Sequence, residues 1–132
     1  MKLVLFLLLV ANSVIAQEIT LSEKEVLEQI CRTWKINYSM TAGKVNTVFP
    51  KLRQYELHFK PDYTFVLITS SGTTPGSWCY NTKRNCIELF YDNHYDLQIT
   101  SLNQYELKMA LSRDAVDGSL NWVKNHSQYV PK

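Results

Sequence analysis

The 132-residue sequence lacks the motifs by which many enzymes are recognised. It has no glycine-rich phosphate-binding loop and no Gly-x-Ser-x-Gly nucleophile elbow. It also lacks an excess of charge: the formal net charge is +2, and no run of Lys and Arg forms a basic stripe. Because neutralising phosphates requires clustered basic side chains, we expect no nucleic-acid partner.

No apolar run reaches about 20 residues, the length that a membrane-spanning helix needs. The N-terminus instead has a short basic start, an apolar stretch over residues 3–10 and a small-residue site ending at Ala16. This pattern is typical of a secretory signal peptide over residues 1–16. We therefore expect a secreted or periplasmic domain over residues 17–132, without stable membrane insertion after signal removal. A buried N-terminal strand is the alternative.

Cysteine is scarce, with three residues, and one disulfide plus one leftover thiol is the simplest arrangement in an exported chain. Residues 76–90 predict a hairpin whose loop is Asn81–Arg84, which places Cys79 opposite Cys86. Directly opposed strand residues have Cα atoms about 4.5–5.5 Å apart, a separation that a disulfide tolerates. We expect a Cys79–Cys86 disulfide, with Cys31 as a small buried side chain rather than a reactive thiol.

One short helix is predicted before the strands. Ser22 can cap it, Glu25 completes a capping box, and an apolar stripe continues from Val26 to Ile30. The helix should end near Cys31.

Alternating apolar and polar residues predict about eight short strands after this helix. A three-residue turn, 61–63, sets Phe59 opposite Phe65, whereas a two-residue turn would break the match. A loop over residues 102–104 sets Ile99 opposite Leu107. Residues 70–75 are expected to form a loop, residues 120–126 the last strand with Leu120 and Trp122 inward, and residues 127–132 a loose tail. The expected strands are 32–40, 53–60, 64–70, 76–80, 85–90, 95–100, 105–111 and 120–126.

A meander of this length favours closure, because a closed sheet has no exposed edges. We therefore predict an all-β fold, an antiparallel up-and-down barrel of about eight strands with one short N-terminal helix. The alternative is an open sheet wrapped on the helix, as in cystatin-like folds. The side chains expected to point inward are rich in rings: Trp34, Tyr38, Tyr55, Phe59, Phe65, Trp78, Tyr80, Tyr95, Tyr105 and Trp122.

Several short motifs are similar to those of the small lipocalin-like domains common in exported bacterial proteins. They are Thr33-Trp34-Lys35-Ile36, the Phe59–Phe65 hairpin, Gly76-Ser77-Trp78-Cys79-Tyr80, Ile87-Glu88-Leu89 and the Ile99–Leu107 hairpin. Arg32 and Tyr63 stand where that family has glycine. The resemblance implies a calycin-type barrel and no conserved chemistry.

The inward tyrosines suggest a function, because buried hydroxyl groups need hydrogen-bond partners and a wet or ligand-lined barrel mouth supplies them. Tyrosines near strand ends, with their hydroxyls in solvent, are the alternative. We expect the barrel to bind a small apolar or amphipathic molecule without catalysis. The predicted ligand-binding residues are Trp34, Tyr38, Phe59, Phe65, Trp78 and Tyr80.

Other functions have less support in the sequence. A filled barrel acting as a protein–protein interaction module, on the cell surface or in the periplasm, is suggested by Val66 and Ile68 on an outward face. An enzyme is suggested by the unexplained Cys31 alone. Asp92, His94 and Asp96 can present ligands to a cation, but a polar turn explains them equally well, and we expect no metal and no catalytic residue. The sequence indicates no cofactor and identifies no protein partner.

Overall fold

The computed structural model describes residues 19–47, 55–92, 94–110 and 126–132, where one helix is followed by nine strands of a single antiparallel sheet. The helix is α1 (Glu23–Ile30). The strands are β1 (Thr33–Thr41), β2 (Lys44–Asn46), β3 (Glu56–Phe59), β4 (Thr64–Thr69), β5 (Gly72–Asn81), β6 (Cys86–Tyr91), β7 (His94–Leu102), β8 (Leu107–Ala110) and β9 (His126–Pro131).

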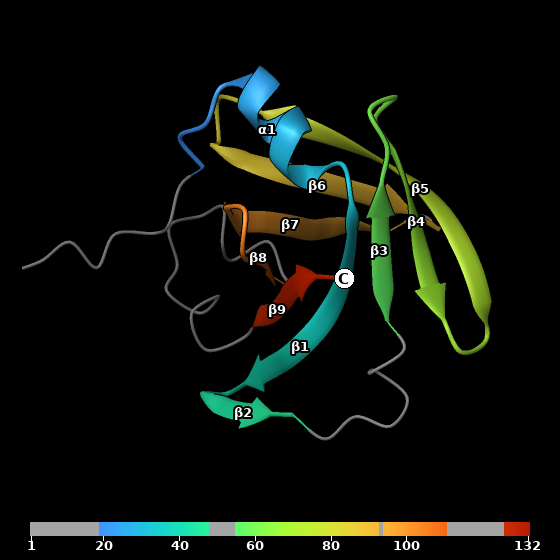
Figure 1. Ribbon diagram of the computed structural model, residues 1–132. Coiled ribbons are helices and arrows are strands. Elements are labelled where there is room, and N and C mark those ends of the chain that lie inside the picture. The colour runs from blue at the N-terminus through green and yellow to red at the C-terminus, as the bar shows by residue number, and fades with distance from the viewer. Residues whose placement is uncertain (1–18, 48–54, 93, 111–125) are drawn as a thin grey trace, which may run out of the picture.

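The sheet closes on itself. From β3 to β9 each strand pairs with the next one, and β1 pairs with β3 on one side and with β9 on the other. Eight strands, β1 and β3–β9, therefore form an antiparallel barrel, while β2 extends the far end of β1 as a hairpin (Figure 1). The predicted up-and-down barrel with one short helix is confirmed, and the open sheet is wrong.

Helix α1 lies across one end of the barrel (Figure 1). The predicted capping box is present: Ser22 Oγ accepts from the Glu25 amide, and the Glu25 carboxylate accepts from the Ser22 amide. Val26 and Ile30 are fully buried in the barrel's core. The indole of Trp34 donates a hydrogen bond of 3.0 Å to the Ile30 carbonyl, which joins the helix end to β1.

The half of the barrel next to α1 is solid. Because neighbouring strands run in opposite directions, the start of β1, the end of β3 and the start of β8 meet beneath the helix. Large apolar side chains fill this half, and each is at most 2% exposed: Trp34, Phe59, Trp78, Ile87 and Leu107.

The three-residue turn between β3 and β4 is confirmed, since Phe59 pairs with Phe65. Asp62 stabilises the turn by accepting hydrogen bonds from the amide and the hydroxyl of Thr64. These bonds hold the pKa of the Asp62 carboxyl below its usual value. Tyr63 takes a left-handed conformation, φ 66°, at the position where glycine would be least strained.

The central hairpin differs in register from the prediction. Asn81 pairs with Cys86 and Cys79 with Glu88, so the loop is Thr82–Asn85, one residue later along the chain than predicted. The side-chain oxygen of Asn81 accepts from two loop amides, and Asn85 adopts φ 53°, a conformation that asparagine tolerates. The partner of each β5 residue shifts by two residues along β6, which is one full period of the side-chain alternation. The same side chains therefore still face inward.

The predicted disulfide is wrong. In the observed register Cys79 and Cys86 are diagonal neighbours rather than opposed, and all three cysteines are free thiols. Cys79 Sγ instead lies 3.6 Å from a carboxylate oxygen of Glu88.

The chain end is ordered, so the predicted loose tail is wrong. Residues 126–131 form β9, which pairs with both β8 and β1, and its Tyr129 is 4% exposed. Most of the strand predicted at residues 120–126, with Leu120 and Trp122, lies outside the described residues. The signal peptide predicted at residues 1–16 also lies outside them.

Two further predictions of register are corrected. Ile99 pairs with Met109 rather than with Leu107, because the loop spans residues 103–106 with Leu102 opposite Leu107, and a bulge in β7 between Ile99 and Ser101 then shifts the pairing by one residue. The loop expected over residues 70–75 is largely strand: β5 starts at Gly72, which pairs with Thr69 across a two-residue turn. Among the described residues, no helix is long and apolar enough to cross a bilayer.

Gly76 provides a test of the packing beneath the Phe65 ring. A Cβ atom at Gly76 would lie 2.5 Å from Phe65 Cε1 and 2.7 Å from the Phe90 carbonyl oxygen. Because the carbonyl belongs to the sheet, it cannot move away without disturbing strand pairing. We expect Gly76→Ala to lower the free energy of unfolding by about 1–3 kcal/mol, measured by chemical denaturation. Ser77→Ala, at the exposed neighbouring position, should change it by less than about 0.5 kcal/mol; equal denaturation midpoints for the two variants would contradict the packing.

Candidate functional site

The half of the barrel away from α1 contains a cavity of about 210 Å³ that is partly open to solvent. An eight-stranded barrel is just wide enough to be filled by side chains or to enclose one small molecule. Here the half beneath the helix is filled and the other half is hollow. The lining residues are Ile36, Ser39, Tyr55, Leu57, Phe65, Leu67, Leu89, Tyr91, Leu97, Met109, Ser127 and Tyr129.

A bulge in β1 decides which side chains reach the cavity from this strand. Ile36 pairs with Tyr129, but Asn37 is an extra residue, and pairing resumes with Tyr38 opposite Gln128. The extra residue reverses the alternation, so that Ile36 and Ser39 both line the cavity. The side-chain amide of Asn37 holds the bulge by donating to Gln128 Oε1 at 2.7 Å.

Three of the hydroxyl groups of the lining, those of Ser39, Ser127 and Tyr129, lie where β1 meets β9. Ser39 pairs directly with Ser127, both side chains are buried, and the Ser127 hydroxyl donates to the Ser39 hydroxyl at 3.5 Å. Tyr129 lies one inward position further along β9. Burial, with the nearby hydroxyls of Tyr55 and Tyr91, raises the pKa of Tyr129 well above its usual value, so this phenol stays neutral.

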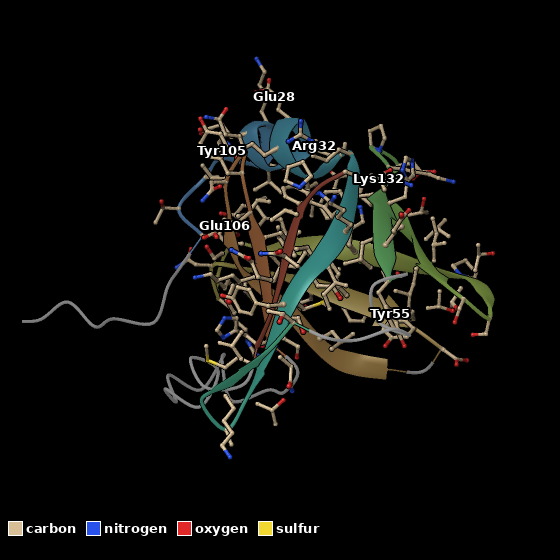
Figure 2. The ribbon with its side chains drawn as sticks, turned by 60° about the horizontal axis from the view of Figure 1, so that its bottom comes forward. Glu28, Arg32, Tyr55, Tyr105, Glu106 and Lys132 are labelled. Atoms are coloured by element: carbon tan, nitrogen blue, oxygen red, sulfur yellow. The ribbon has the colours of Figure 1, made fainter. Side chains whose placement is uncertain are left out.

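Most of the remaining lining is apolar. It consists of Tyr55 and Tyr91 and of apolar side chains from five strands, β3, β4, β6, β7 and β8: Leu57, Phe65, Leu67, Leu89, Leu97 and Met109. The cavity is therefore a mostly apolar hollow with a pair of serines at the β1–β9 seam. Tyr55, just before β3, lies well away from Glu28 and Arg32 at the α1 end of the barrel (Figure 2).

Of the six predicted ligand-binding residues, Phe65 lines this cavity. Trp34, Phe59 and Trp78 are inside the barrel as predicted, but they pack in the solid half next to α1. Phe59 and Trp78 make an edge-to-face ring contact with a centroid distance of 6.2 Å.

The other two predicted residues hold different parts of the fold together. The Tyr80 hydroxyl donates to the carbonyls of Ile19 and Leu21, which fixes the segment entering α1. Tyr38 follows the bulge and turns to His126, with its hydroxyl 3.1 Å from Nε2. Neither lines the cavity. Tyr105, also expected inward, is 72% exposed, so that expectation is wrong.

The alternation in the sequence does not predict the two lining serines. It does predict most of the apolar wall. Leu57, Leu67 and Leu97 lie at inward positions of alternating segments, and the same periodicity that located the strands identifies them. Ser39 lies at an outward position by that periodicity, and Ser127 falls in the segment that the sequence predicts as a loose tail. A bulge and the pairing of the last strand, both determined by the folded barrel, place these two residues in the cavity.

Metal binding and a reactive thiol can be compared with the described side chains. Among them, no group of three His, Cys, Asp or Glu residues is arranged to hold a metal ion. The side chains of His94 and Asp96 lie outside the description. Cys31, the residue that suggested an enzyme, caps the end of α1 and is half-buried. Burial, and then the nearby Asp62 carboxylate, raise its pKa, which disfavours the reactive thiolate.

Comparison with known proteins supports the fold. No family model matches the chain, and no curated protein matches it. A crystal structure of a DUF4847 family protein from Bacteroides vulgatus is similar, with a TM-score of 0.54 and 12% sequence identity over 77% of this chain and 93% of that one. At this identity the likeness concerns the fold alone. The closed barrel agrees with the calycin-type barrel that the lipocalin-like motifs imply.

The thiols provide a test of the observed register. Burial raises the pKa of Cys86 to about 11, and burial also raises the pKa of Cys31 and Cys79. Below these pKa values the thiols stay protonated, so iodoacetamide should label the native protein slowly near neutral pH, and faster as the pH rises. Denaturation without a reducing agent should expose all three for labelling, as counted by mass spectrometry. Labelling of Cys31 alone would reveal a disulfide and contradict the register.

Proposed function

We propose that this protein binds one small, mostly apolar molecule in the cavity, without catalysing a reaction on it. The observation that supports this most directly is the hollow of about 210 Å³ in a barrel whose other half is tightly packed. Interiors normally pack with few voids larger than a water molecule, so a void of this size needs an explanation. Binding a ligand is the explanation that also accounts for its apolar wall.

The size of the cavity limits the ligand. An apolar cavity of about 150 Å³ accommodates benzene, so 210 Å³ fits a molecule of about eight or nine non-hydrogen atoms. A long-chain lipid is too large to be enclosed. The most suitable class is a single or fused aromatic ring, or a short branched aliphatic chain, with few polar atoms.

The lipocalin-like motifs and the N-terminal pattern suggest where this binding takes place. We propose a lipocalin-like binding protein that acts outside the cytoplasm, secreted or periplasmic, after removal of residues 1–16. The mass of the chain recovered from its native host tests the proposal: it should correspond to a chain that starts at Gln17. A chain that retains residues 1–16 would contradict export by a cleaved signal.

An interaction module is a second candidate, and one observation favours it. Val66 and Ile68 point away from the cavity, are half-exposed, and do not belong to the core cluster that includes α1. The helix therefore leaves part of this outer face open. A protein partner on this face would use a different side of β4 from the one that lines the cavity.

Two substitutions at neighbouring positions of β4 separate the candidates. Leu67→Trp fills the cavity, whereas Ile68→Trp adds the same side chain on the outer face. We expect indole to bind the unchanged protein with a Kd of about 0.1–1 mM, followed by NMR shifts of amides around the cavity. Leu67→Trp should weaken this binding at least about tenfold, and Ile68→Trp should leave it unchanged.

Indole binding by the two variants distinguishes an internal site from an outer one. Loss of indole binding in Leu67→Trp alone, with an unchanged melting temperature, supports an internal site. No indole binding by the unchanged protein, or equal losses in both variants, would overturn the internal site and leave the outer face as the candidate.

A further inference from the structure

We propose that the cavity selects an uncharged ligand and that Ser39 and Ser127 together bind its one polar group. This inference rests on the proposed function and narrows it to a chemical class: a small neutral molecule with an apolar body and a carbonyl, amide or hydroxyl group at one end.

The lining excludes charge. None of the twelve described residues that line the cavity carries a formal charge at neutral pH, and no described cation is present there to pair with a carboxylate. An ion entering an apolar site loses its hydration, and the cost is large unless an opposite charge replaces it. Tyr129 shows the same effect on a protein group, since burial disfavours its charged form and so raises its pKa.

The serine pair has hydrogen-bonding capacity to spare. Each hydroxyl supplies one donor and two acceptor sites, and the bond between Ser127 and Ser39, at 3.5 Å, is long for two hydroxyls, which normally lie about 2.5–3.0 Å apart. Both side chains are buried, at 9% and 4% exposure, so bulk water has limited access to them. A ligand hydroxyl placed between them can accept from one serine and donate to the other, an amide can do the same with its oxygen and its N–H, and a carbonyl oxygen can accept from either serine.

The position of the pair sets the orientation of the ligand. The serines lie at the β1–β9 seam, whereas four leucines, one from each of β3, β4, β6 and β7, form much of the wall away from it. A ligand with its polar end at the seam places its apolar body against Leu67 and Leu97. The reverse orientation would bury the polar group against leucine without a hydrogen-bond partner, which costs free energy.

Three molecules of the same shape test the charge selection. Benzamide, benzoate and benzamidinium have the same number of non-hydrogen atoms, but at neutral pH they are neutral, negative and positive. We expect benzamide to bind at least about tenfold more tightly than either ion, measured by NMR titration of the purified protein. Equal or tighter binding of one of the ions would overturn the selection of an uncharged ligand, although the internal site would remain.

Serine variants test the polar contact. Ser39→Ala and Ser127→Ala should each weaken benzamide binding about two- to tenfold, the range expected for one hydrogen bond. Ethylbenzene, which has a similar apolar body and no polar atom, should bind both variants as well as it binds the unchanged protein. Equal losses for both molecules would mean that the serines act on the shape of the cavity, and would overturn the proposed contact.

The two proposals fail in different ways. If neither benzamide nor ethylbenzene binds the unchanged protein at millimolar concentration, the internal site itself is wrong. If ethylbenzene binds and benzamide shows no advantage over the ions, the internal site stands and the selection is wrong.

Discussion

The pairing of β9 with β1 is the interaction on which the rest of the structure depends. It joins the last described strand to the first, with six paired positions from Trp34 to Met40. Without it the sheet would have two long edges and its inner face would be open to water. With it, the apolar faces of eight strands enclose a single interior that α1 covers at one end (Figure 1).

The difference between the two halves of that interior follows from side-chain size and from the helix. Next to α1, the rings of Trp34, Phe59 and Trp78 belong to one buried cluster, to which the helix adds Val26 and Ile30. Further along the strands the lining consists mainly of leucines, tyrosines and two serines, and no helix enters. An eight-stranded barrel is filled only if large side chains occupy each layer, so the second half stays hollow.

The sequence predicts the fold well because its strands alternate clearly and its helix carries a capping box. It predicts the site less well, for reasons that are local. All six predicted ligand-binding residues are aromatic. Large rings also fill the half of the barrel that α1 covers, so an inward ring does not by itself indicate a binding site. A bulge at Asn37, which pairing with β9 determines, moves Ser39 inward and Tyr38 outward. The hairpin loop of four residues fits two positions of the sequence, and the Asn81 side chain selects the later one, which separates the cysteines.

The same seam that closes the barrel also carries the polar part of the cavity. Ile36 and Ser39 come from β1, while Ser127 and Tyr129 come from β9, so a ligand that contacts these residues touches both closing strands. Such a ligand binds the closed barrel and has no equivalent site on an opened chain. Its binding free energy therefore adds to the stability of the closed state, by an amount that grows with the ligand concentration relative to Kd. On the proposed function, ligand binding and barrel closure would be coupled through the same four residues.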